Sequence, residues 1–365
     1  MTLQLYFARR FFRSFLSVLL IFFAILFLID LIEQIRRFGT TDTGFGTLMV
    51  LTVLNVPESL YRILPLIMIL ATLALFLSLA RSSELVVTRA SGRSALKSLI
   101  APIIVAVMIG VIAVGAFNPI VAATQKQYEV LTTRISGEVS TLSVSVDGLW
   151  LRQGSRQGQT VIRANRANLD GTVLSDVTFL GYDRDGQPTF RIEAERAELV
   201  TGAWAITGAK EWRFDTGAAI PEVDAFETPQ MSLASNLTRN QILDSFGTPS
   251  AIPIWELPGF IRRLEAAGFS ARIHRTFLHM ELALPILLVA MVLVGAGFTM
   301  RHTRFGRTGM MVMFALILGF SLYFIRNFAA ILGENGQIPV LMAAWGPPVA
   351  AVLLPLGLLL HLEDG

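Results

Sequence analysis

The sequence predicts a membrane α-helical bundle of six transmembrane helices, three before and three after an inserted extracytoplasmic antiparallel β domain. The first observation is composition: 53% of the 365 residues are hydrophobic and only 16% are charged, whereas soluble domains carry about 25% charge. The second is placement, because 34 of the 57 charged residues lie between positions 126 and 275. The third is β patterning inside that polar insert. Together these features argue against a cytosolic enzyme.

Six charge-free stretches are long enough to cross a bilayer, or nearly so, since crossing takes roughly 20 mainly apolar residues. They are residues 14–29, 63–80, 98–125, 282–300, 308–325 and 337–360. The first is short, but Phe11, Phe12 and the mainly apolar stretch 31–35 extend it. A cleavable signal peptide would need a small-residue cleavage site after the apolar run. Asp30 and Glu33 follow it instead.

Basic residues in the short loops predict the orientation, because cytoplasmic loops carry an excess of lysine and arginine. Ten basic residues flank one set of span ends: Arg9, Arg10, Arg13, Arg81, Arg89, Arg93, Lys97, Arg301, Arg304 and Arg307. The opposite short segments, 30–62 and 326–337, hold four basic and five acidic residues. Both termini are therefore predicted to be cytoplasmic, with the long insert on the outer side.

Short alternating apolar runs separated by turn residues occupy positions 142–231. Residues 177–182 and 190–194 lie on either side of Asp185-Gly186, a dipeptide typical of tight hairpins. Spacings of about ten to fifteen residues between runs are typical of an antiparallel sandwich or jelly roll. Residues 254–267 carry apolar side chains at helical spacing and predict a short helix.

The sequence lacks the motifs of the common catalytic and metal sites. It has no cysteine, no G-x-x-x-x-G-K-[ST] nucleotide loop and no G-x-S-x-G elbow. The four histidines show no metal-ligand spacing and are interpreted as interfacial side chains. Gly295 and Gly297, inside the fourth span, indicate close helix packing. From the missing motifs we expect no catalytic residue, no metal and no cofactor. The net charge of only +3 also predicts no nucleic-acid partner.

Charged residues gather near the predicted outer ends of the spans, not at mid-membrane, where proton- or sodium-coupled carriers hold carboxylates. For single residues such as Asp30, Glu281 and Arg326, snorkelling to the interface and helix capping are the simpler interpretation. Together with Arg36 and Arg37, however, the outer mouth offers several guanidinium groups suited to phosphate. The further members of this set are Arg62, Arg272 and Arg275. We hypothesise that an anionic amphiphile is held at the outer leaflet.

One predicted cytoplasmic loop, residues 81–92, carries helix signals at both ends. Ser83 is suited to cap the start of a short helix and Gly92 to cap its end. Leu85 and Val86 would be exposed on this loop unless a partner covered them. The residues alone leave two readings open, a helix that lies on the membrane surface and a helix that docks into a partner.

At this loop the sequence resembles a known family. Ser83-Glu84-Leu85-Val86-Val87, followed by Ala90-Ser91-Gly92, is similar to the coupling-helix segment of the lipopolysaccharide-export permeases of the Lpt system, the YjgP/YjgQ family. The resemblance covers essentially the whole length, including residues 6–13, Asn55-Val56-Pro57, the β insert and the six spans. Gly148-Leu149-Trp150 resembles the LptG type more than its LptF paralogue.

The resemblance implies a non-catalytic permease subunit of an ABC transporter in the bacterial inner membrane, with a periplasmic β-jelly-roll domain as its insert. Such a subunit extracts lipopolysaccharide from the outer leaflet and passes it to a periplasmic β-jelly-roll bridge toward the outer membrane. The implied partners are an LptF-like permease as heterodimer, a cytoplasmic LptB-like ATPase dimer that hydrolyses ATP, a single-span LptC-like protein and an LptA-like bridge.

The resemblance also implies roles for individual residues. ATPase coupling falls to a helix over about residues 82–92, with Glu84, Leu85, Val86 and Arg89. Lipid binding falls to Arg36, Arg37 and Lys126, joined by Arg62 and Arg326 from the basic outer mouth. Asp30 and Glu129 depart from the family pattern, which has basic residues at these places.

The predicted domains are residues 1–125 with spans one to three, the β-jelly-roll domain 126–250, a connecting helix in 251–275, and 276–365 with spans four to six. One alternative is another ABC-type envelope permease for lipoprotein or amphiphile export, but such permeases generally carry the large domain after the first span. The other is a non-transporting scaffold for an envelope β domain, which would leave Glu84 and its loop without a task.

Overall fold

The computed structural model gathers the chain into two compact units, which are described here one at a time. The membrane unit comprises Met1–Ile135, Ser250–Trp255 and Arg272–Gly365, and the sheet unit comprises Ser136–Pro249 and Glu256–Ala271. The structure describes all residues except 1, 40–42, 83, 85–94, 137–141, 146–147, 156–157, 169–170, 184, 215–224, 236, 239–241, 243–247, 267–269, 301–307 and 364–365.

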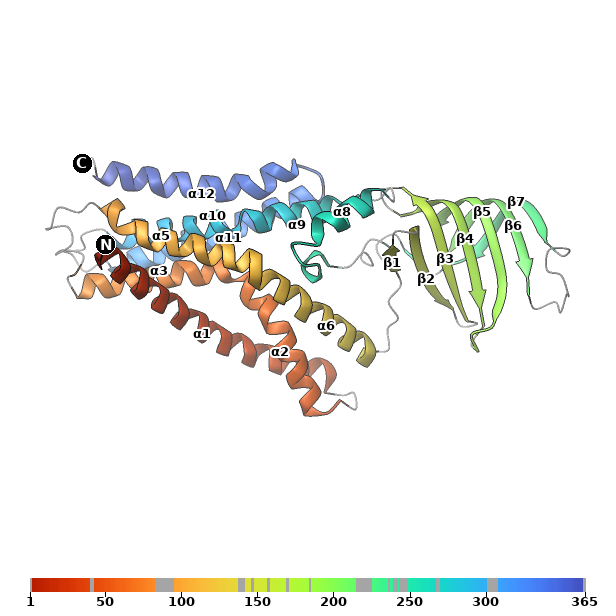
Figure 1. Ribbon diagram of the computed structural model, residues 1–365, viewed down its shortest axis with the longest axis horizontal. Coiled ribbons are helices and arrows are strands. Elements are labelled where there is room, and N and C mark those ends of the chain that lie inside the picture. The colour runs from red at the N-terminus through yellow and green to blue at the C-terminus, as the bar shows by residue number, and fades with distance from the viewer. Residues whose placement is uncertain are drawn as a thin grey trace. The chain divides into compact units, whose positions relative to one another are not determined.

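The membrane unit is helical (Figure 1). Its elements are α1 (Thr2–Phe38), α2 (Phe45–Arg62), α3 (Leu64–Arg81), α5 (Ala95–Ile112), the π-helix η1 (Ala113–Phe117), α6 (Asn118–Ser136), the 3-10 turn η2 (Pro249–Ala251), α9 (Arg272–Leu282), α10 (Leu284–Thr299), α11 (Thr308–Glu334) and α12 (Val340–Glu363). Within the part of the chain that the structure describes, five stretches of helix are long and apolar enough to cross a membrane. A sixth is formed if α9 and α10, bent by 49°, count as one span. These spans coincide with the six predicted stretches, so the predicted helical bundle is confirmed.

Proline explains the bend between α9 and α10. Pro285 occupies one of the first two positions of α10, where its missing N–H removes the hydrogen bond that would join it to Glu281. The same arrangement separates α2 from α3, because Pro65 stands at the start of α3. Both breaks begin a new helix with the fixed φ angle that proline supplies.

Burial differs sharply among the spans. Nearly every side chain of α10 is buried, and this helix contacts α3, α5, α11 and α12. An all-round apolar helix of this kind belongs in the interior of a bundle. By contrast, only 6% of the most apolar window of α1 and 11% of that of α11 are buried. The long apolar surfaces of α1 and α11 therefore face either lipid or another protein chain.

Two features of the membrane unit were not predicted. The first is α2, an amphipathic helix whose buried residues Leu48, Leu51, Thr52, Val56 and Leu60 follow a helical period on one face. The second is η1, a five-residue π-helix that interrupts the third span between α5 and α6. In α-helices such π-segments occur mostly as single turns. Within this turn the Gly115 carbonyl accepts a hydrogen bond from Trp255 Nε1 at 3.1 Å.

The sheet unit contains one seven-stranded antiparallel sheet whose strands follow each other in chain order, as a meander. The strands are β1 (Leu142–Ser145), β2 (Gly148–Ser155), β3 (Gly158–Ala167), β4 (Val173–Tyr182), β5 (Pro188–Val200), β6 (Ala203–Arg213) and β7 (Phe226–Ala234). The short helix α8 (Leu257–Ala266) completes the unit. The predicted inserted antiparallel β domain is thus confirmed, and α8 lies within the predicted helix at residues 254–267.

One face of the sheet carries the core of this unit. Ile162, Phe179 and Ile192 are register partners on β3, β4 and β5, and all three are buried. Trp204 on β6 is fully buried and meets Phe179 edge-on, with ring centroids 6.2 Å apart, which is a favoured aromatic geometry. Between β4 and β5 the hairpin turns at Gly186, whose φ of +80° suits glycine. The alternation of apolar side chains in the sequence therefore predicts the buried face of the sheet correctly.

Candidate functional site

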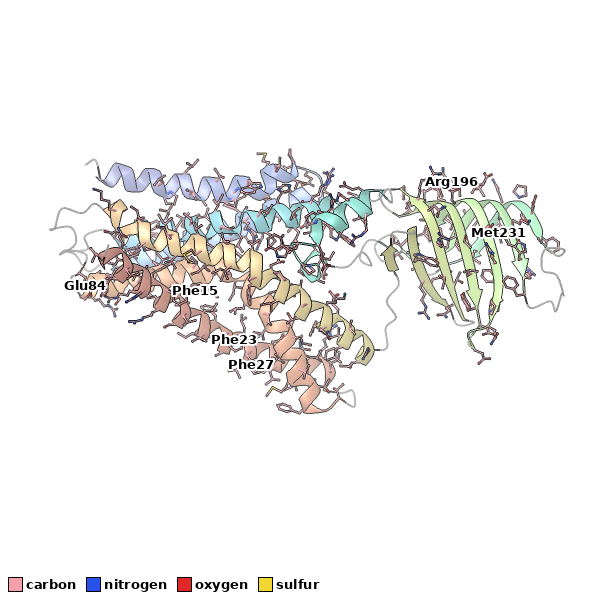
Figure 2. All side chains as sticks on the ribbon, in the orientation of Figure 1. Phe15, Phe23, Phe27, Glu84, Arg196 and Met231 are labelled. Atoms are coloured by element: carbon pink, nitrogen blue, oxygen red, sulfur yellow. The ribbon has the colours of Figure 1, made fainter. Side chains whose placement is uncertain are left out.

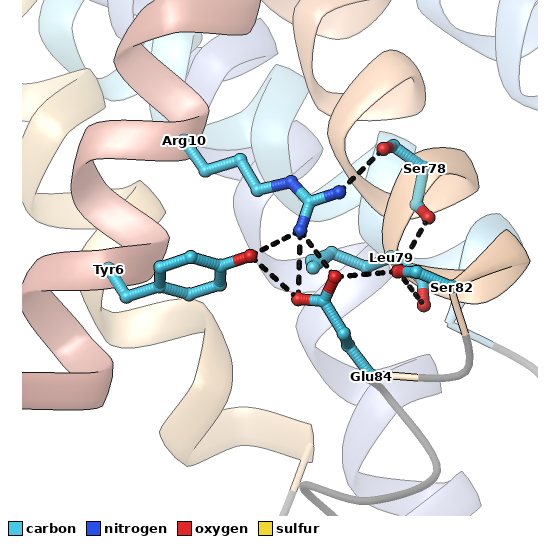
Figure 3. Close-up of polar contacts among 6 residues, drawn as sticks. All are labelled: Tyr6, Arg10, Ser78, Leu79, Ser82 and Glu84. Atoms are coloured by element: carbon cyan, nitrogen blue, oxygen red, sulfur yellow. Dashed lines mark hydrogen bonds and ion pairs between the residues drawn. The ribbon is translucent and has the colours of Figure 1, made fainter.

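A polar cluster joins the N-terminal end of α1 to the C-terminal end of α3 (Figure 3). It consists of Tyr6, Arg10, Ser78, Ser82 and Glu84, and we call it the Glu84 cluster. Arg10 Nη1 donates to both carboxylate oxygens of Glu84, at 2.6 and 2.8 Å, while Arg10 Nη2 donates to Ser78 Oγ at 2.7 Å. The Tyr6 hydroxyl donates to Glu84 Oε2 at 2.9 Å, and Ser82 Oγ donates to Oε1 at 2.7 Å.

The electrostatics of the cluster favour the charged form of Glu84. Partial burial by itself would raise the pKa of this carboxyl, but the hydrogen bonds from Arg10, Ser82 and Tyr6 outweigh it and hold the pKa below its ordinary value. The side chains of Arg10 and Glu84 are 25% and 33% exposed. A charge-assisted pair of this kind fixes Glu84, near the start of the predicted coupling segment, against α1.

The remaining predicted coupling residues, Leu85, Val86 and Arg89, lie outside the described residues, as does most of the predicted helix at 82–92. Of that segment the structure describes Ser82 and Glu84. Figure 2 places Glu84 beside the N-terminal end of α1, with Phe15, Phe23 and Phe27 progressively further along that helix. Glu84 is therefore positioned by two membrane helices as well as by its own loop.

Two of the predicted lipid-binding residues, Arg36 and Arg37, lie in the last turn of α1. Arg36 makes a bidentate pair with Glu33 on the same helix, at 3.0 and 2.7 Å, and the two side chains are 77% and 48% exposed. Arg37 lies over the ring of Phe38, with its Cζ 5.1 Å from the ring centroid. Both guanidinium groups remain open to solvent, and their present partners come from α1 itself.

Lys126 is exposed on α6, whose following turns pack against the same end of α1. Tyr128, Leu131 and Ile135 of α6 pack on a buried cluster formed by Phe38, Leu48 and Leu51. The ends of α1 and α6 are thereby held together with the start of α2. This apolar contact brings Arg36, Arg37 and Lys126 to one end of the membrane unit.

Arg62 and Arg326 belong to a different part of the unit. Arg62 ends α2 eleven residues beyond Leu51, about 16 Å along the helix axis, and pairs with Glu58 at 2.8 Å. Arg326 of α11 interacts electrostatically with Glu281 and Tyr61. The five predicted lipid-binding residues therefore form two groups.

Glu281 departs from the sequence interpretation. Its side chain was expected at the membrane interface, but it is only 4% exposed and accepts hydrogen bonds from the Tyr61 hydroxyl and from Asn118 Nδ2, the latter at 3.3 Å. His274, also interpreted as interfacial, is likewise buried. The interfacial reading is wrong for both because α9 packs on α11 and α12. Among the residues that the structure describes, no group of His, Asp or Glu could hold a metal.

The sequence matches the family model described as lipopolysaccharide export system permease LptF/LptG over residues 5–361. The chain belongs to the LptF/LptG family. No curated protein matches it. The family membership confirms the resemblance to the Lpt-system permeases and makes the chain a multi-pass lipopolysaccharide-export permease that works with other Lpt components. It is a transporter subunit and not itself an enzyme.

Sequence reasoning missed one polar link in this permease. Asn55 Nδ2 of α2 donates to Asp30 Oδ1 of α1 at 2.6 Å, and Gln34 Nε2 donates to the Tyr128 hydroxyl of α6 at 3.1 Å. Asp30 is thus a structural link between α1 and α2. The polar residues at 30 and 34, one helical turn apart on an apolar helix, were the only sequence signal for it.

Proposed function

We propose that this permease is the LptG-like half of a heterodimer that extracts lipopolysaccharide from the outer leaflet of the inner membrane. An LptF-like permease supplies the other half, and a cytoplasmic LptB-like ATPase dimer supplies the energy, since the chain has no nucleotide loop of its own. The lipid passes to a periplasmic β-jelly-roll bridge of LptC-like and LptA-like proteins. Both termini lie in the cytoplasm and the sheet unit lies in the periplasm.

The observation that carries this proposal is the surface of α1. Between Phe15 and Gln34 no residue of α1 is buried, and most of the exposed side chains before Asp30 are large and apolar, among them Leu20, Phe23 and Leu28. This apolar stretch ends at the exposed pair Arg36 and Arg37. An amphiphile with acyl chains and phosphate groups needs two adjoining surfaces. The acyl chains need an apolar surface, and the phosphates need a cluster of cations at its end.

The pairing of Arg36 does not oppose phosphate binding. Its partner Glu33 lies three residues away on the same helix, and exposed pairs of this kind add little to stability because water competes for both groups. A lipid phosphate can therefore replace Glu33 at small cost. Arg37 lies over the ring of Phe38 and interacts electrostatically with the same exposed Glu33 carboxylate. A phosphate therefore competes with one weak acidic neighbour for both arginines.

Photo-crosslinking of the assembled complex tests the lipid site. A photoreactive residue at position 36, 37 or 126 is expected to capture lipopolysaccharide more strongly than one at Trp345, whose indole Nε1 lies 3.5 Å from His279 Nδ1 within the bundle. Arg36→Glu combined with Arg37→Glu should weaken capture at position 126, because two phosphate-attracting charges become repulsive. The proposed phosphate site consists of Arg36, Arg37 and Lys126, without Arg62 and Arg326. Arg62→Glu is therefore the matched control, since Arg62 lies in the other group.

Equal capture at positions 37, 126 and 345 would contradict the proposed site. So would full capture in the Arg36→Glu, Arg37→Glu variant together with a loss in the Arg62→Glu control. Mass spectrometry of lipid that co-purifies with the complex identifies the captured species independently of the crosslinker.

A further inference from the structure

The Glu84 cluster places a residue of the predicted coupling segment in contact with α1. This segment, about residues 82–92, is the one expected to dock into the ATPase, and it is called the docking segment below. Glu84 receives hydrogen bonds from three residues of its own chain, and Arg10 alone reaches both carboxylate oxygens. The second amino group of Arg10 is bound to Ser78 of α3. The planar guanidinium fork therefore ties α1, α3 and the docking segment to one another.

This ion pair differs from the other described pairs of the chain. The exposed fractions of Arg10 and Glu84 are 25% and 33%, against 72% and 52% for Arg166 and Asp176 on the sheet. Arg10 and Glu84 are also 74 positions apart in sequence, so the pair is a tertiary contact and not a helix-surface pair. An ion pair with several shared donors and reduced exposure holds its geometry better than an isolated surface pair.

The rest of α1 shows what such a contact can move. Phe7, Phe11 and Phe15 are buried on one face near its N-terminus, and Gln34 and Phe38 are buried at its other end. The residues between Phe15 and Gln34 are not buried. A helix whose ends are buried and whose middle is not transmits a displacement of one end along its length, because its backbone hydrogen bonds keep it stiff.

We propose that Arg10 and Tyr6 are positioning residues that fasten the docking segment to α1, so that a displacement of this segment by the ATPase is delivered directly to the helix with the exposed apolar surface. This rests on the proposed function and adds its mechanical route. Glu84 then has a role within the chain, as the attachment point of α1.

A spin-label distance measurement tests the route without relying on lipid release. The chain contains no cysteine, so Leu20→Cys on α1 and Leu353→Cys on α12, both exposed, can be labelled selectively in the ATPase-bound complex. In the parent protein the distance distribution is expected to shift between the nucleotide-free and vanadate-trapped states. Arg10→Glu and Glu84→Arg should each reduce the shifted population by up to about fivefold, the upper end of what an ion pair of this exposure contributes.

The charge-reversed double variant tests whether the pairing of Arg10 with Glu84 is itself required. Arg10→Glu with Glu84→Arg restores an opposite-charge pair inside the chain and should recover most of the shift with an unchanged ATPase. Arg9→Glu, an exposed neighbour on the same helix, is the matched control and should keep the full shift. A double variant as defective as either single variant, or an Arg10→Glu variant with the parental shift, would overturn the proposed route.

Lipid release measured on the same samples separates the two proposals. A nucleotide-dependent shift in the parent protein without any release of lipopolysaccharide would refute the proposed function while leaving the Arg10–Glu84 route supported. Normal ATP-dependent release in both single variants, Arg10→Glu and Glu84→Arg, would refute the route while leaving the proposed function intact.

Discussion

Replacing Gly110 by alanine tests the packing of the membrane unit at a close backbone contact between α5 and α10. A Cβ atom at Gly110 of α5 would lie 2.6 Å from Cα and 2.9 Å from Cβ of Pro285 in α10. Carbon atoms in favourable contact are about 3.5–4.0 Å apart, so the two helices must separate by roughly 1 Å. The obstacle is backbone and a proline ring, neither of which can rotate away.

The expected cost follows from two opposed effects. Overpacking of a tight interior costs about 1–3 kcal/mol, while the change from glycine to alanine in a helix returns up to about 1 kcal/mol. The net destabilisation of Gly110→Ala should be about 1–2 kcal/mol. Because α10 also contacts α3, α11 and α12, its displacement disturbs the whole unit.

Gly297→Ala is the matched control, since a Cβ there meets no atom within 4 Å although the residue is buried in α10. Thermal unfolding of the purified permease in one detergent and at one scan rate compares the two variants. Gly110→Ala should unfold at a lower temperature than the parent, and Gly297→Ala at the same or a higher one. Equal unfolding temperatures for both variants would refute the packing argument.

Three further predictions concern the sheet unit, the topology and the Glu84 cluster. Trp204→Ala should cost about 3–5 kcal/mol by emptying a buried site beside Phe179, seen as faster proteolysis of the sheet unit. A reporter inserted at Gly186, in a hairpin turn with open space around it, should be active only outside the cytoplasm, and one at the C-terminus only inside. Because the pKa of Glu84 is lowered on folding, the stability it contributes is complete above its ordinary value of 4.5 and lost as the pH falls through the lower folded value.

Each of these has a control. Trp212→Ala, on the same strand but only half-buried, should be milder than Trp204→Ala; an equal effect would contradict the assigned core. A cytoplasmic signal from the Gly186 reporter would invert the topology. In the parent protein the unfolding temperature should fall as Glu84 is protonated, and Glu84→Gln should remove this part of the fall. A parent protein and variant whose unfolding temperatures respond identically to acid would contradict the lowered pKa.

The fold was largely predictable because its main signals are local. A charge-free stretch of about 20 residues has few alternatives to a membrane span, and period-2 alternation beside Asp185-Gly186 leaves few alternatives to a hairpin. Of the bent fourth span, the predicted stretch 282–300 covers α10 but not α9, which carries Arg272, Arg275 and Glu281 and was therefore not recognised as apolar. The helix α2 was recoverable too, from the helical period of Leu48, Leu51 and Leu60.

The site was less predictable because its contacts join distant positions. Sequence reasoning selected Glu84 but assigned it to an external partner, and nothing local indicates that Arg10, 74 positions earlier, pairs with it. Glu281 was misjudged for the same reason, since its partners Tyr61 and Asn118 come from other helices. Pairing of charged side chains across a bundle depends on helix rotation, which a hydropathy pattern leaves undetermined.

The most direct test of the proposed transport role is ATP-dependent release of lipopolysaccharide from proteoliposomes to a soluble β-jelly-roll acceptor. The vesicles contain this permease with an LptF-like partner and an LptB-like ATPase, and the acceptor carries a photoreactive residue that traps the lipid. We expect trapping that requires ATP and is lost when this permease is omitted or when the ATPase cannot hydrolyse ATP. Equal trapping without ATP, or with the permease left out, would contradict the role proposed here.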